Sequence, residues 1–239
     1  MPARRYALIA ALIVPVFAPL LALAGCDREA PKPPEPRSAI EAPPEIPVMG
    51  PERVILAFGD SLLAGYRLED GEGYPERLEA SLRANGINAR MTNAGVSGDT
   101  TQAGLQRLAF TLDSMKTRPE LAIVSLGGND MLRGLPPEQT RANLAAMIGE
   151  LKQRGIRVLL LGMLAAPNLG KDYAARFDPI FPQLAEEHGV ALVPFFLQPV
   201  IDQPELIQED HVHPTAQGIE EMVAATLDDV EQALGKKGK

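Results

Sequence analysis

Cysteine and histidine are scarce in this chain, and their scarcity limits the chemistry open to it. Of 239 residues one is cysteine, Cys26, and three are histidine. A single cysteine excludes a disulfide within the chain, and so few strong ligands leave little from which to build a transition-metal site. The chain also has no internal repeat, which excludes repeat architectures.

Positive charge is also in short supply. The 23 lysines and arginines face 31 aspartates and glutamates, a formal net charge of −8. Without residues 1–25 the chain loses two arginines and keeps 21 basic against 31 acidic residues, a net charge of −10. A chain of this charge repels nucleic acid phosphates and anionic lipid surfaces. We therefore expect no nucleic acid partner.

The first 25 residues have the pattern of a secretion signal. Two arginines precede an apolar stretch over residues 6–23, and Leu23-Ala24-Gly25-Cys26 follows. A transmembrane anchor is the alternative, because the stretch is nearly long enough to span a bilayer. Pro15 and Pro19 inside it, and the small residues before Cys26, favour cleavage.

This segment resembles the precursor of a bacterial lipoprotein. The resemblance implies that Cys26 carries lipid as the first residue of the mature protein, which leaves no thiol to act as nucleophile. The following residues are dense in proline and typical of an extended tether. We predict a signal peptide (1–25), a tether (26–51) and one folded domain (52–236), anchored by lipid in the bacterial cell envelope and facing the periplasm. Which membrane holds the anchor stays open.

Five apolar runs alternate with amphipathic segments through the domain. They cover residues 54–58, 87–91, 121–126, 158–161 and 190–193. Runs that are apolar on both faces are typical of buried parallel strands. Pro75 and Gly86 bound one helical pattern, Pro136 and Gly155 bound another, and an apolar stripe after Pro214 predicts a last helix. The alternation predicts an α/β fold, a three-layer α/β/α sandwich around a central, mostly parallel five-stranded sheet.

Four short motifs carry the candidate chemistry. They are Gly59-Asp60-Ser61-Leu62, Ser97-Gly98-Asp99-Thr100, Gly127-Gly128-Asn129-Asp130 and Asp210-His211-Val212-His213-Pro214. Ser61, Gly98 and Asn129 follow the first, second and third predicted strands. Ligands bind at the carboxyl edge of an open parallel sheet, so we expect these three residues to meet in one crevice.

Each of these residues also has a simpler interpretation. Ser61 fits a nucleophile at a helix start, yet a capping serine in a turn accounts for the tripeptide equally well. The Gly-x-Ser-x-Gly pattern of α/β-hydrolases is absent, since Leu63 takes the place of its second glycine. The Gly98 N–H and the Asn129 carboxamide fit donors to an oxyanion, yet a helix start and a turn are expected there anyway.

One histidine fits the role of a base best. His188 lies in a charged segment before Gly189 and fits a helix end. His213 follows Asp210 by three residues, so the carboxylate can fold back and hold one ring nitrogen, as a base requires. His211 is adjacent to the acid and would point elsewhere, which leaves its role open. The alternative is a zinc or iron site of Asp210, His211 and His213, but it lacks a further strong ligand, and we predict neither metal nor cofactor.

The ordered set of Ser61, Gly98, Asn129 and His213 resembles the SGNH (GDSL-type) hydrolases. The resemblance runs from the first strand to the last helix and implies a flavodoxin-like fold. It implies that Ser61 is the nucleophile, that His213 is the base oriented by Asp210, and that the backbone of Ser61, Gly98 and the Asn129 side chain form the oxyanion hole.

Further motifs resemble one branch of that family, which includes thioesterase I, lysophospholipase L1 and bacterial arylesterases. They are Asn93-Ala94-Gly95-Val96-Ser97-Gly98-Asp99-Thr100, Asn129-Asp130-Met131-Leu132-Arg133-Gly134, and Met163 with Pro167-Asn168-x-Gly170-x-x-Tyr173. The branch implies a monomeric serine esterase or thioesterase that hydrolyses small acyl substrates through an acyl-enzyme, with broad preference. Residues that could line an acyl groove, or simply pack in the core, are Leu62, Leu63, Met131, Leu132, Leu135 and the loop 164–169.

Two other functions remain open from the sequence. A carbohydrate O-acetylesterase acting on envelope polysaccharide would use the same groups in a shallow polar pocket. A non-catalytic envelope lipoprotein would keep the fold without turnover, although the complete set of catalytic groups argues against it. Neither the physiological substrate nor its acyl length follows from the sequence.

Overall fold

A computed structural model of the chain describes residues 48–235. The predicted signal peptide, the predicted lipid attachment site at Cys26 and most of the predicted tether lie outside the described residues. Within 48–235, no helix is both long enough and apolar enough to cross a membrane. The domain boundaries at residues 52 and 236 stay predictions.

The core of the domain is a parallel sheet. Its strands are β1 (Arg53–Gly59), β2 (Ala89–Gly95), β3 (Leu121–Ser125), β4 (Arg157–Leu161) and β5 (Ala191–Val193). They lie in the order β2-β1-β3-β4-β5, and every neighbouring pair is parallel. β1 and β3, in the middle of the sheet, are almost completely buried, which is why the sequence shows them as continuous apolar runs. The predicted fold class is confirmed.

The second strand lies further along the chain than its apolar run predicted. The run covered residues 87–91, whereas β2 begins at Ala89 and continues to Gly95. Ile87 instead belongs to the turn that leaves the preceding helix, where its N–H donates to the Leu82 carbonyl. β2 is an edge strand with only half-buried or exposed residues after Ala89, so polar residues such as Asn93 are tolerated and the apolar pattern stops too early.

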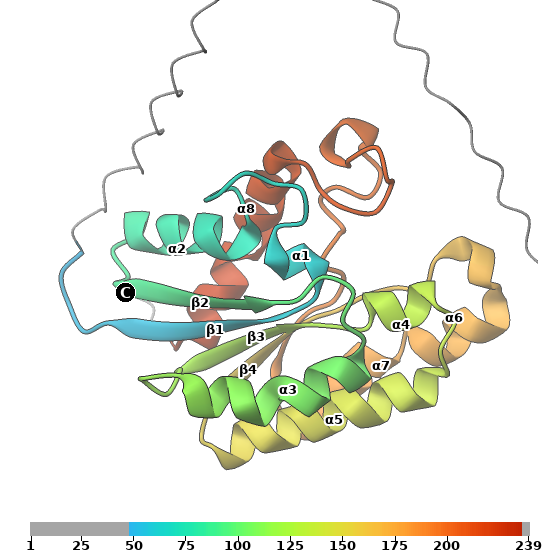
Figure 1. The fold of residues 1–239 in the computed structure, drawn as a ribbon, viewed down its shortest axis with the longest axis horizontal. Coiled ribbons are helices and arrows are strands. Elements are labelled where there is room, and N and C mark those ends of the chain that lie inside the picture. The colour runs from blue at the N-terminus through green and yellow to red at the C-terminus, as the bar shows by residue number, and fades with distance from the viewer. Residues whose placement is uncertain (1–47, 236–239) are drawn as a thin grey trace, which may run out of the picture. The chain divides into compact units, whose positions relative to one another are not determined.

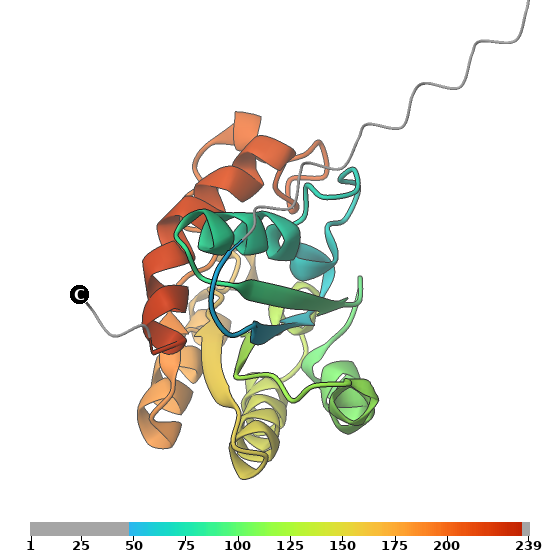
Figure 2. The same ribbon diagram turned by 90° about the vertical axis from the view of Figure 1, so that its left-hand side faces the viewer.

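Helices cover both faces of the sheet. α2 (Tyr74–Ala84) and α8 (Ala216–Ala233) pack on one face, and α3 (Thr101–Ser114), α5 (Pro137–Gln153) and α7 (Ile180–His188) cover the other (Figure 1). Figure 2 shows the two helical layers from the left-hand side of Figure 1. The last helix forms as its apolar stripe predicted, because Ile219, Met222 and Val230 are buried along one side.

Short elements gather at the carboxyl ends of the strands. These are α1 (Ser61–Ala64), α4 (Gly128–Leu132), α6 (Lys171–Phe177) and the 3₁₀ turns Pro167–Leu169 and Pro204–Leu206. Figure 1 shows α4 and α6 on the right, beyond the strand ends, and α1 above the ends of β1 and β2. All three motifs that follow a strand therefore lie at one edge of the sheet.

Glycines allow α1 to sit directly on the sheet. A Cβ at Gly95 would lie 2.4 Å from the Ala64 nitrogen, and one at Gly59 would lie 2.9 Å from the Leu63 Cδ1 atom, both in α1. Neither position has room for a side chain. The close approach fixes the helix that carries Ser61 against β1 and β2.

Candidate active site

Ser61 is the first residue of α1, immediately after β1. The preceding Asp60 caps this helix, because its Oδ1 accepts a hydrogen bond of 3.1 Å from the Leu62 N–H. The backbone carbonyl of Asp60 also accepts from Leu63 and Ala64. The strand and the cap together fix the backbone from which the Ser61 hydroxyl projects.

His213 is presented by a tight loop that precedes α8. The loop is closed at its base by an antiparallel bridge between Ile207 and Pro214 and by a 2.7 Å hydrogen bond from the Gln208 N–H to the His213 carbonyl. Inside the loop the His211 N–H donates to the Gln208 carbonyl at 3.0 Å. His211 has φ of 58°, a left-handed conformation in which the chain reverses. Its side chain is exposed at the mouth of the site.

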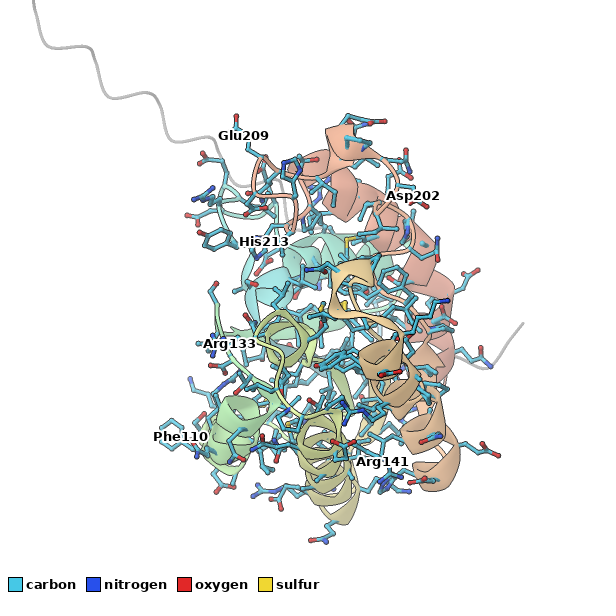
Figure 3. The ribbon with its side chains drawn as sticks, turned by 90° about the vertical axis from the view of Figure 1, so that its right-hand side faces the viewer. Phe110, Arg133, Arg141, Asp202, Glu209 and His213 are labelled. Atoms are coloured by element: carbon cyan, nitrogen blue, oxygen red, sulfur yellow. The ribbon has the colours of Figure 1, made fainter. Side chains whose placement is uncertain are left out.

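Ser61, His213 and Asp210 form a continuous hydrogen-bonded chain. His213 Nε2 lies 2.8 Å from Ser61 Oγ, and His213 Nδ1 lies 2.8 Å from Asp210 Oδ2. The Tyr66 ring packs against the imidazole with 4.4 Å between ring centroids. Figure 3, which looks onto the carboxyl edge of the sheet, shows His213 there, far from Phe110 and Arg141. Ser61 and Asp210 thus hold the imidazole from both sides.

Asp210 is held as a carboxylate. Burial by itself raises the pKa of this carboxyl group, but hydrogen bonds from the His213 N–H, the His213 ring and the Val212 N–H outweigh it and lower the pKa to about 2. The group is therefore charged across the neutral range. A charged acceptor at Nδ1 favours the tautomer in which Nε2 is free to accept a proton.

Three donors surround the space next to Ser61 Oγ. Ser61, Gly98 and Asn129 all line one cavity together with His213. Among residues 48–235, neither the Ser61 N–H nor the Gly98 N–H has a hydrogen-bond acceptor. Gly98 has φ of +86°, a conformation that favours glycine. Free backbone N–H groups beside a serine hydroxyl are what a developing oxyanion requires.

The Asn129 carboxamide is held by Asp60. Asn129 Nδ2 lies 3.4 Å from Asp60 Oδ2, a long hydrogen bond at the floor of the site. Burial raises the pKa of Asp60 to about 7, although the Leu62 N–H and the Asn129 carboxamide act in the opposite direction. Asp60 was not singled out from the sequence as a site residue. Its place beside Ser61 was visible, but its contact with Asn129, 69 residues away, was not.

Asp130 joins the two segments that carry Gly98 and Asn129. It is buried, and its carboxylate accepts hydrogen bonds from the Thr101 N–H at 2.8 Å, the Thr101 hydroxyl at 2.5 Å and the Thr140 hydroxyl at 3.2 Å. Thr101 begins α3, three residues after Gly98. In the sequence Asp130 is only one member of a motif, and nothing there indicates this role.

The cavity in front of Ser61 is mostly apolar. Its volume is about 540 Å³. The apolar side chains around it are Leu62, Met131, Leu132, Met163, Leu164, Ala165, Ala166, Pro167, Phe195, Leu197, Ile201 and Val212. Of the residues expected to line a groove, Leu62, Met131, Leu132 and residues 164–167 of the loop do so, whereas residues 168 and 169 do not. Leu63 does not, because its side chain projects from α1 into the core and is fully buried, and Leu135 does not line the cavity either.

The remaining imidazoles do not gather around a common centre. His188 ends α7, as expected, and its carbonyl accepts a hydrogen bond from Lys152. Both ring nitrogens of His213 already face Asp210 and Ser61. In the part of the chain that the structure describes, no three or more His, Cys, Asp or Glu residues are placed to hold a metal ion. Among the described residues, the fold therefore brings no further ligand to the alternative metal site of Asp210, His211 and His213.

Comparisons with known proteins agree with the motifs. The model of the GDSL-like lipase/acylhydrolase family matches residues 57–220. The arylesterase of Vibrio mimicus is 40% identical over 176 residues, 72% of this chain and 87% of that protein. Thioesterase 1/protease 1/lysophospholipase L1 of Escherichia coli K12 is 38% identical over 160 residues, 67% of this chain and 74% of that protein.

A solved structure agrees as well. AlinE4, a SGNH-hydrolase family esterase, is 62% identical to the chain, with a TM-score of 0.67. The match covers 77% of this chain and 98% of AlinE4. Because the family model spans more than half of the sequence and the relatives match along most of their own length, the chain belongs to the GDSL-like lipase/acylhydrolase family, the SGNH hydrolases.

Proposed function

We propose that this protein is a serine esterase that hydrolyses carboxylic acyl esters and thioesters with broad preference. The observation that carries the proposal is the hydrogen-bonded chain from Ser61 through His213 to Asp210, which opens onto an apolar cavity. The names of the relatives, an arylesterase and a thioesterase/lysophospholipase, support the hydrolysis of both acyl esters and acyl thioesters.

Each group in the site has a step to perform. His213 Nε2 accepts the Ser61 proton as Oγ attacks the acyl carbonyl and forms a C–O bond. The carbonyl oxygen becomes an oxyanion and is held by the N–H groups of Ser61 and Gly98 and by the Asn129 carboxamide. The C–O or C–S bond to the leaving group then breaks, and the alcohol or thiol takes the proton from His213. Water, deprotonated by His213, hydrolyses the acyl-enzyme and restores Ser61.

The lining of the cavity favours acyl chains over acetylated sugars. A site for a polysaccharide acetyl group needs hydrogen-bond partners for sugar hydroxyls, because polar groups buried without partners cost free energy. Leucine, methionine, alanine and phenylalanine supply none of these and instead gain from contact with methylene groups. We therefore place the carbohydrate O-acetylesterase second.

A series of p-nitrophenyl esters tests this function. Burial of each further methylene group contributes about 0.8 kcal/mol, so kcat/KM should rise by up to about fourfold per methylene from acetate through butyrate to octanoate. Octanoyl thioester should be hydrolysed as well. An activity limited to acetate would select the O-acetylesterase, and no hydrolysis of any ester by the wild-type protein would contradict the function itself.

We also propose that the enzyme is a monomer held in the cell envelope by lipid on Cys26. A single chain supplies every residue of the site, and the sequence up to Cys26 supports the anchor. In membrane and soluble fractions of cells producing the full chain, the wild-type protein should be in the membrane and the Cys26→Ser variant should leave it. Equal distribution of the two proteins would contradict the anchor, and a dimeric mass of the detergent-solubilised protein in light scattering would contradict the monomer.

A further inference from the structure

Gln208 links the two segments that carry Ser61 and His213, although no motif contains it. Its Nε2 donates one hydrogen bond of 2.9 Å to the Tyr66 carbonyl and another of 2.8 Å to the Pro214 carbonyl. Its backbone N–H donates to the His213 carbonyl at 2.7 Å. Tyr66 and Gln208 are 142 residues apart in the chain.

Within residues 48–235, the only other hydrogen bond that joins these two segments is the one between Ser61 and His213. The Ser61 segment is a four-residue helix followed by turns, and the bridge and backbone hydrogen bonds that close the His213 loop all lie within the loop and its base. Between the segments lie the Ser61–His213 hydrogen bond itself and the stacking of Tyr66 on His213. Both of those contacts form only when the two segments are correctly spaced. The spacing matters for catalysis, because a displacement of 1 Å between reacting groups can cost about 10² in rate.

The chemistry of the position fits a primary amide. The two acceptors are backbone carbonyl oxygens, so the group between them must offer two N–H donors, which also fixes the orientation of the amide. A glutamate would place its carboxylate against both carbonyl oxygens. A methionine has similar length and fills the space, but it offers no donor.

From these contacts we propose that Gln208 is a positioning residue for catalysis. It holds the His213 loop against the segment after Ser61, so that Nε2 stays within hydrogen-bond distance of the serine hydroxyl. This role rests on the esterase function proposed above. Gln208 reaches the reaction only through His213 and Ser61 and does not line the cavity.

The matched variants are Gln208→Met and Gln203→Met. Gln203 is an exposed glutamine whose Nε2 donates to the Pro199 carbonyl within its own turn, so it controls for the loss of a glutamine hydrogen bond. With p-nitrophenyl butyrate, Gln208→Met should lower kcat by about 10- to 100-fold with KM within about twofold, since the acyl cavity is unchanged. Gln203→Met should leave both constants unchanged.

A double variant separates positioning from a general loss of structure. If Gln208 acts through the imidazole, Gln208→Met should have no further effect on the small residual activity of a His213→Ala protein. A loss by the same factor in both backgrounds would show that Gln208 merely supports the fold, and wild-type kinetics in Gln208→Met would overturn the proposal directly.

A proton NMR measurement tests the position of the ring without turnover. The His213 ring protons lie against the Tyr66 ring of the other segment, with 4.4 Å between ring centroids, so their signals should shift in Gln208→Met relative to the wild-type protein. Unchanged signals would overturn the positioning role even if the wild-type protein hydrolysed no ester, whereas the absence of ester hydrolysis alone would contradict the esterase function.

Discussion

Replacing Ser61 with alanine should lower kcat for p-nitrophenyl butyrate by roughly 10⁴- to 10⁶-fold. The substitution removes the hydroxyl oxygen that lies 2.8 Å from His213 Nε2, and with it the acyl-enzyme route. The backbone N–H groups of Gly98 and position 61 and the Asn129 carboxamide remain. The small residual rate should therefore exceed that of the ester in water, because the oxyanion donors still act on an attacking water molecule.

Ser97→Ala is the matched control for this loss. Ser97 lines the same cavity and offers the same hydroxyl group, but no hydrogen bond links it to the imidazole. Its kcat should stay within about threefold of the wild-type value, because this exposed hydroxyl makes no hydrogen bond to His213 or Ser61. Substantial activity in Ser61→Ala, or an equal loss in Ser97→Ala, would show that the nucleophile has been assigned to the wrong residue.

The sheet could be predicted from the sequence because its central strands are buried on both faces. β1 and β3 are apolar at almost every position, and short apolar runs separated by helical patterns are typical of parallel strands. β2 was placed too early, since an edge strand with polar residues leaves no such signature beyond Ala89. The difference between the predicted and the observed bounds of β2 does not affect the predicted site, because Gly98 follows the strand in both cases.

Residue type and order were enough to suggest Ser61, Gly98, Asn129 and His213, but not the residues that hold them. Asp130 reaches Thr101 across 29 positions, and Gln208 reaches Tyr66 across 142. Such partners depend on how the elements pack, and any aspartate or glutamine on a loop would look the same in the sequence. The same limit applies to Leu63, whose apolar side chain suits a groove and a core equally well.

Asp210→Asn should lower kcat at neutral pH by about 10⁴-fold while leaving the fold intact. The Val212 and His213 N–H groups both donate to Oδ1, which asparagine can still supply, so the loop keeps its shape. The amide nitrogen then replaces Oδ2 and faces His213 Nδ1. Since an amide N–H cannot accept the Nδ1 proton, the ring moves its proton to Nε2 and can no longer accept one from Ser61.

Glu209→Gln provides the matched control, because it removes the same charge from the neighbouring position. Glu209 is exposed, and Figure 3 shows its side chain pointing away from His213. Its kcat should be close to that of the wild-type protein. A comparable loss in both variants would mean that the net charge of the loop, rather than the bond to Nδ1, supports catalysis.

The wild-type protein and Asp210→Asn should also differ in how their stability depends on pH. The folded-state pKa of Asp210 is lowered from 3.8 to about 2, so its carboxylate stabilises the folded state above about pH 4, and this contribution is lost as the pH falls through about 2. Asp210→Asn lacks the contribution at every pH. The wild-type Tm should therefore exceed that of the variant at pH 5 and converge on it toward pH 2, whereas a constant difference would show that Asp210 is not a stabilised carboxylate.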